Sequence, residues 1–142
     1  MGAIYSVTCR NKECRYHKEL RMGVGMRCFS HLCNLKDALF SGEEKNPEAE
    51  KILREGGELG SGAIYLCPKC KEFISDPTIY CKTNITESPY GTVCYDVAFP
   101  FGVPTCKDCG GELQYIKNVL SSKVKCPKCE GDLKSKHVGY FD

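Results

Sequence analysis

The stretches Cys106-Lys-Asp-Cys109-Gly-Gly-Glu-Leu113 and Cys126-Pro-Lys-Cys129-Glu-Gly-Asp-Leu133 decide the fold of this 142-residue chain. In each stretch two residues separate the cysteines, a gap that lets both thiolates of one tight turn reach a single metal ion. Proline presets a turn dihedral, the glycines permit positive φ, and turn N–H groups can donate to the sulfurs. Sixteen residues lie between Cys109 and Cys126, a spacing typical of four-cysteine zinc sites. We therefore predict that Cys106, Cys109, Cys126 and Cys129 bind one structural zinc ion.

The segment between these two doublets has the composition of a hairpin. Residues 112–116 and 123–125 favour short strands, and residues 120–122 favour a turn. Two CxxC doublets joined in this way resemble the zinc ribbon family over roughly residues 104–134. The resemblance implies a C-terminal zinc ribbon, which we assign to residues 104–142. Glu130-Gly131 after the last cysteine departs from the immediate glycine of the usual turn.

Cysteine is unusually frequent in the whole chain, with 12 residues. The first ten residues lack the basic and apolar segments of a secretory signal, and no run of about 18 apolar residues could cross a membrane. We therefore expect a cytoplasmic protein without a membrane partner. In that reducing compartment a cysteine-dense chain binds metal more often than it forms disulfides.

The eight upstream cysteines can be grouped in two ways. Sequential grouping gives two sites, so that the chain would bind three metals: Cys9, Cys14, Cys28 and Cys33 form one, and Cys67, Cys70, Cys81 and Cys94 form the other. The second grouping starts from an echo, because Gly-Ala-Ile-Tyr at residues 2–5 precedes Cys9 and the same tetrapeptide at residues 62–65 precedes Cys67. If the echo marks the two halves of one ribbon, the site consists of Cys9, Cys14, Cys67 and Cys70. We favour this interleaved grouping, which leaves Cys28, Cys33, Cys81 and Cys94 as a third site, buried thiols or reactive thiols.

A wider resemblance rests on the opening residues 2–9, a Gly-Val-Gly-Met stretch at 23–26, a helical insertion, residues 64–70 and the C-terminal doublets. Together these are similar to a family of small uncharacterised bacterial double zinc ribbon proteins with rubredoxin-like knuckles. The resemblance implies metal binding and the interleaved first site, and it implies no known activity. The gap of four residues between Cys9 and Cys14 departs from the two-residue gap of that family.

The remaining sequence predicts a small, metal-stabilised, β-rich protein with a short helical insertion in its first ribbon. Asn34 is a good cap for a helix over 35–40, and Asn46-Pro47 begins a second helix that ends at Gly56. A strand followed by a glycine-containing turn is expected over residues 16–26, and short strands are expected at 73–74, 78–80 and 93–97. We assign residues 1–103 to an N-terminal zinc-ribbon module with the helical insertion at about 34–56.

The sequence favours a binding function over catalysis. His17, His31 and His137 are isolated, and no catalytic constellation is found. We predict a zinc-binding protein with structural four-cysteine sites that acts as a binding or adaptor module for protein or nucleic acid. Two zinc ions are expected, or three under the sequential grouping. The alternative is a rubredoxin-like iron electron carrier or a thiol-redox protein, since four cysteines also suit iron.

Charge gives limited support to a nucleic-acid partner. The net charge is only +2. Residues 1–27 carry six basic and two acidic residues, and residues 107–136 carry seven and four, which we interpret as solvated faces. Positive charge near Tyr115 comes from six lysines of the C-terminal ribbon: Lys117, Lys123, Lys125, Lys128, Lys134 and Lys136.

Overall fold

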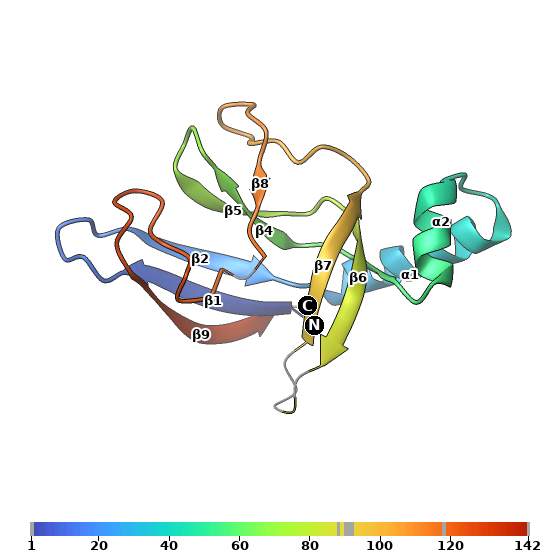
Figure 1. Ribbon diagram of the computed structural model, residues 1–142, viewed down its shortest axis with the longest axis horizontal. Helices are drawn as coiled ribbons and strands as arrows, with labels where there is room; N and C mark the ends of the chain where they lie inside the picture. The colour runs from blue at the N-terminus through green and yellow to red at the C-terminus, as the bar shows by residue number, and fades with distance from the viewer. Residues whose placement is uncertain (1, 88, 90–92, 118, 142) are drawn as a thin grey trace.

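The computed structural model describes residues 2–87, 89, 93–117 and 119–141, and these residues form three antiparallel three-stranded sheets and two helices (Figure 1). The elements in chain order are β1 (Gly2–Cys9), β2 (His17–Met22), α1 (Met26–Ser41), α2 (Pro47–Arg54), β3 (Glu58–Gly60), β4 (Ala63–Cys67), β5 (Glu72–Asp76), β6 (Tyr80–Glu87), β7 (Val93–Pro100), β8 (Gln114–Tyr115) and β9 (Leu133–Phe141). The protein is thus β-rich, as predicted.

The first sheet has the strand order β2-β1-β9 and joins the two ends of the chain. Strand β9 pairs with β1 from Cys9 opposite Leu133 to Gly2 opposite Phe141. The first and last strands therefore lie side by side (Figure 1). Alternation along the strands places Val7 and Leu20 in the core, where they are 1% and 0% exposed.

The second sheet, β5-β4-β8, repeats this plan on a smaller scale. Strands β4 and β5 form a hairpin, and β8, which comes much later in the chain, pairs with β4 through Tyr65 opposite Tyr115. We call residues 2–22 with 123–141 the first module, and residues 63–76 with 104–116 the second module. Along the chain the second module is nested inside the first.

A seam of polar contacts joins the two modules at β2 and β5. The hydroxyl of Tyr16 donates to Glu72 Oε1 at 2.9 Å and accepts from the backbone N–H of Phe73 at 3.2 Å. The Oγ of Ser75 accepts from the N–H of Arg21 and donates to its carbonyl oxygen. Beneath the seam, one hydrophobic cluster contains side chains of both modules: Val7, Tyr16, Leu20, Ile64 and Phe73 are among its buried members.

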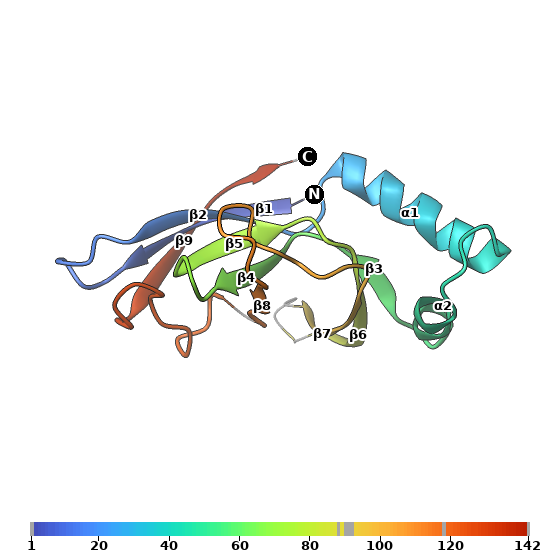
Figure 2. The same ribbon diagram turned by 90° about the horizontal axis from the view of Figure 1, so that it is seen from above.

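The third sheet, β3-β6-β7, carries the helices at one end of the molecule (Figure 2). Helix α2 begins as predicted, because the Asn46 side chain accepts a hydrogen bond from the N–H of Ala49 and Pro47 follows it. Helix α1 begins at Met26, so the prediction that it starts after Asn34 was wrong. No glycine or proline interrupts residues 26–41, so nothing in this segment breaks the helix. The backbone of Gly25 is extended, and the helix therefore begins directly after it.

Candidate metal centres

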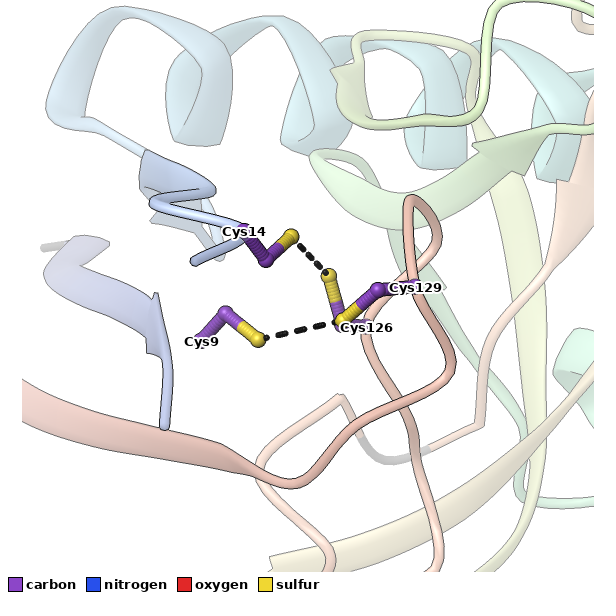
Figure 3. A group of neighbouring side chains, drawn as sticks. All are labelled: Cys9, Cys14, Cys126 and Cys129. Atoms are coloured by element: carbon purple, nitrogen blue, oxygen red, sulfur yellow. Dashed lines mark hydrogen bonds between the residues drawn. The ribbon is translucent and has the colours of Figure 1, made fainter. Parts of the chain in front are cut away.

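Eight cysteines form two separate groups of four, the first of which is drawn in Figure 3. Site 1 consists of Cys9, Cys14, Cys126 and Cys129, and site 2 consists of Cys67, Cys70, Cys106 and Cys109. Within each group all four sulfur atoms lie within 4.8 Å of one another. The eight cysteines are those expected to be ligands from the sequence, but the structure distributes them differently.

The distances between the sulfurs match a tetrahedral metal site. In site 1 the Sγ atoms of Cys9 and Cys129 are 3.5 Å apart and those of Cys14 and Cys126 are 3.7 Å apart. The corresponding distances in site 2 are 3.5 Å and 3.8 Å. A tetrahedron with metal–sulfur bonds of about 2.3 Å has edges of roughly 3.8 Å. Each group can therefore hold one metal ion.

The predicted site of the two late doublets and the favoured interleaved site of the Cys9 and Cys67 doublets were both wrong. Cys106 and Cys109 do not share a site with Cys126 and Cys129, and the Cys9 doublet does not share one with the Cys67 doublet. The physical reason lies in strand pairing. The expected hairpin between the two late doublets does not form, because β8 pairs with β4 while β9 pairs with β1. The doublet before β8 therefore lies next to the β4-β5 hairpin. The doublet before β9 lies next to the β1-β2 hairpin.

The Gly-Ala-Ile-Tyr echo marks equivalent strands, although not two halves of one site. It lies in or next to β1 in the first copy and β4 in the second, and each of these strands is the centre of its sheet. Each strand also ends on the first cysteine of its own site, Cys9 or Cys67. The echo therefore marks the same structural position in two nested modules.

The late doublets of the two sites have the same backbone conformation. The N–H of Cys106 donates to Gly111 O and that of Cys126 donates to Gly131 O, both at 2.8 Å. The next residue after the second cysteine has a positive φ in both, at 72° for Gly110 and 63° for Glu130. Glu130 thus adopts the turn conformation despite its side chain.

Asparagine accommodates the longer gap between Cys9 and Cys14. The carbonyl oxygen of Asn11 accepts from Cys14 N–H, and its side-chain oxygen accepts from Glu13 N–H, both at 3.1 Å. Its own N–H donates to the Cys9 sulfur at 3.4 Å. The sequence interpretation missed Asn11, although an asparagine two residues after a ligand is a recognisable turn signal.

Backbone N–H groups lower the pKa of one cysteine in each site. The N–H of Cys70 donates to Cys67 and lowers the pKa of that thiol to about 7. The N–H of Gly131 donates to Cys129 and lowers the pKa of its thiol, also to about 7. Such N–H donors are the contacts that stabilise thiolate ligands.

Crowding of the sulfurs has the opposite effect on other members of the sites. Burial raises the pKa of Cys9 to about 12, and the neighbouring Cys109 thiol is the main cause that raises the pKa of Cys70 to about 12. A metal that binds four thiolates must displace these protons. The clusters therefore suit a cation that offsets the charge of the sulfurs.

The four remaining cysteines do not form a third group among the described side chains. Cys33 is exposed on α1, whereas Cys81 is fully buried in β6 among residues of the helices. The side chains of Cys28 and Cys94 lie outside the described residues. The three histidines lie outside both clusters.

Searches of protein-family models, curated proteins and solved structures give no match to this chain. Within the described residues, no helix has both the length and the apolar character needed to span a membrane. The two cysteine clusters are compatible with a protein of the double zinc ribbon kind.

Proposed function

We propose that this protein is a zinc-binding protein in which two structural four-cysteine sites hold a double zinc ribbon, and that it acts as a binding or adaptor module for a macromolecular partner. The observation that carries the proposal is the pair of clusters, each with four sulfurs at tetrahedral distances. Four cysteines fill the coordination of zinc and leave no position for a catalytic water. The metals would therefore act on the fold rather than on a substrate.

The topology explains why structural metals suit this chain. The site 1 contact between Cys9 and Cys129 joins residues separated by 120 positions, and the site 2 contact between Cys67 and Cys109 joins residues separated by 42. The first module depends on a strand pair between the two ends of the chain. A metal that ties these distant segments together supplies folding free energy directly.

Metal analysis with absorption spectroscopy tests the proposal. We expect two zinc ions per chain in native mass spectra and a colourless protein. A strong chelator should abolish the cooperative unfolding transition, because the metal-free sites hold thiols and thiolates crowded at less than 4 Å. A protein that stays equally stable without metal would contradict the structural role. A red protein that contains iron would instead support the electron-carrier alternative.

A further inference from the structure

Nesting concentrates positive charge in the first module. Its two segments, 2–22 and 123–141, together carry ten basic and four acidic residues, a net of +6. The whole chain has a net charge of +2, so the other residues carry −4. Four thiolates and one divalent metal would add −2, which leaves about +4 on this module. Strands from both ends of the chain, which carry only a small excess of basic residues as separate segments, are thus joined in one sheet.

Strand register places several of these charges on one face of β2-β1-β9. Thr8 lies opposite both His17 and Lys134, and Ser6 lies opposite both Glu19 and Lys136. Directly opposed residues point to the same side of a sheet, and Val7 between them is buried on the other side. Lys134 and Lys136 are exposed on this face. Among the residues that pair with Ser6 and Thr8, Glu19 is the only acidic one.

The basic face differs from the lysine cluster expected near Tyr115. Lys117 forms an ion pair with Asp96 at 2.8 Å, and Lys125 forms one with Asp132 at 2.6 Å. Lys128 donates to the carbonyl oxygen of Cys70 at 2.9 Å. Neither Lys134 nor Lys136 takes part in an ion pair among the described residues. Of the six lysines, Lys123 and the two lysines of β9 therefore have no ion pair or side-chain hydrogen bond among the described residues.

A cleft beside β9 has the chemistry of a phosphate site. It has a volume of about 260 Å³, and its polar lining residues are Arg10, Lys134, Ser121, Ser122 and Ser135. No acidic residue lines it. Two cations and three hydroxyl groups are the groups that contact nucleic-acid phosphates in proteins.

Exposed aromatic rings also lie on β9, but on the other face of the sheet from Lys134 and Lys136. His137 lies opposite Tyr5 and Tyr140 lies opposite Ala3, and these partners point to the Val7 side, where the cleft lies. The rings of His137 and Tyr140 have their centroids 4.6 Å apart, and Tyr5 contacts His137 at 5.2 Å. Tyr140 is 65% exposed. Aromatic rings on the same face as a cleft with two cations form a stacking platform for unpaired bases. Neither a lipid surface nor an intact duplex presents such bases.

We infer that the β9 side of the first module binds single-stranded nucleic acid, with a backbone phosphate in the cleft at Arg10 and bases against Tyr140 and His137. The inference rests on the proposed function, because the metal of site 1 would hold β9 against β1. It makes the partner of the proposed binding module a nucleic acid. Phosphate contacts supply affinity here, and ring stacking supplies the preference for single strands.

Fluorescence anisotropy with a labelled single-stranded RNA of mixed sequence tests the inference on the metal-loaded full chain. If three phosphates are contacted, affinity should fall about 20-fold between about 50 and 200 mM salt. The double variant Arg10→Gln with Lys134→Gln, which removes both cations of the cleft, should make the logarithmic salt slope shallower by roughly 1.4. The matched control, Lys45→Gln with Lys51→Gln on the helical end, removes the same charge and should leave the slope unchanged.

Stacking is tested separately from charge. Tyr140→Ala should weaken binding roughly fivefold or more without altering the salt slope. The matched control is Phe29→Ala, because Phe29 is similarly exposed at 59% but lies on α1. Equal effects of the two aromatic variants, or of the two double charge variants, would overturn the inference. Binding to anionic vesicles as tight as to RNA and insensitive to Tyr140→Ala would also overturn it.

Metal content measured on the same samples separates the two proposals. A protein that holds two zinc ions but does not bind the RNA at low salt refutes the nucleic-acid inference and leaves the structural zinc proposal standing. A protein that lacks metal refutes the zinc proposal, whatever it binds.

Discussion

Paired cysteine substitutions give the sharpest test of how the two sites are assembled. The variant Cys9→Ser with Cys126→Ser removes two ligands from site 1 and leaves site 2 complete. The variant Cys9→Ser with Cys67→Ser removes one ligand from each site. We expect the first variant to retain one metal per chain in the presence of a chelator and the second to retain none. Both variants carry two substitutions, so their difference reports the grouping alone.

The expected magnitude follows from the lengths of chain that the sites close. A cross-link across 120 residues, the separation of Cys9 and Cys129, removes roughly 5 kcal/mol of chain entropy from the unfolded state. The 42-residue separation of Cys67 and Cys109 corresponds to roughly 4 kcal/mol. Loss of site 1 should therefore destabilise the metal-loaded protein by about 1 kcal/mol more than loss of site 2, apart from differences in metal affinity.

Native mass spectrometry counts the metals, and denaturant titration measures the free energy of unfolding. Cys33→Ser is the matched control, because this exposed cysteine lies outside both clusters and should leave two metals in place. The result that would refute the structure is the reverse pattern. If the Cys9 and Cys67 variant keeps one metal while the Cys9 and Cys126 variant keeps none, the doublets pair as in the interleaved grouping, with Cys9, Cys14, Cys67 and Cys70 in one site.

Three further substitutions test the packing around the sites, each measured by chemical denaturation of the metal-loaded protein. Tyr16→Phe should lower the free energy of unfolding by about 1–3 kcal/mol, because the N–H of Phe73 loses its partner at the seam; an unchanged midpoint would show that the seam is not formed. Gly62→Ala should lower the free energy of unfolding by at least about 1–2 kcal/mol, since Gly62 has φ +76° and an added Cβ would collide with a backbone oxygen. The control Gly102→Ala places its Cβ in open space and should lower it less. Asn46→Ala should cost about 0.5–2 kcal/mol through loss of the α2 cap, and a smaller loss would mean that this helix end is already frayed.

The sequence predicted which cysteines come together better than it predicted how they are divided. A two-residue gap is a local property, and the turn that it requires can be read from Pro127 or Gly110 without knowledge of the rest of the chain. The division between two sites depends instead on whether β8 and β9 pair with each other or with distant hairpins. That choice depends on long-range strand pairing. The spacing of 16 residues between the doublets is compatible with either outcome.

The distribution of charge in space could not be predicted from the sequence for the same reason. A window along the sequence averages neighbours in the chain, whereas the potential at a surface sums neighbours in space. Residues 1–27 and 107–136 were weakly basic as separate windows, and the pairing of β1 with β9 joins strands from both ends of the chain in one sheet. The same pairing separates Lys134 and Lys136 from the lysines whose positive charge is already paired with Asp96 and Asp132.

Nesting by itself couples the two sites only weakly. Closing site 2 shortens the loop between Cys14 and Cys126 from 112 residues to roughly 70, because the 42 residues between Cys67 and Cys109 no longer count. The change in closure entropy is only about 0.4 kcal/mol, a factor of about two in metal affinity. Any stronger coupling must pass through the contacts between the modules, such as the Tyr16 hydroxyl and the shared core beneath it. A stepwise release of the two metals would therefore report on the rigidity of this seam rather than on the order of the segments in the chain.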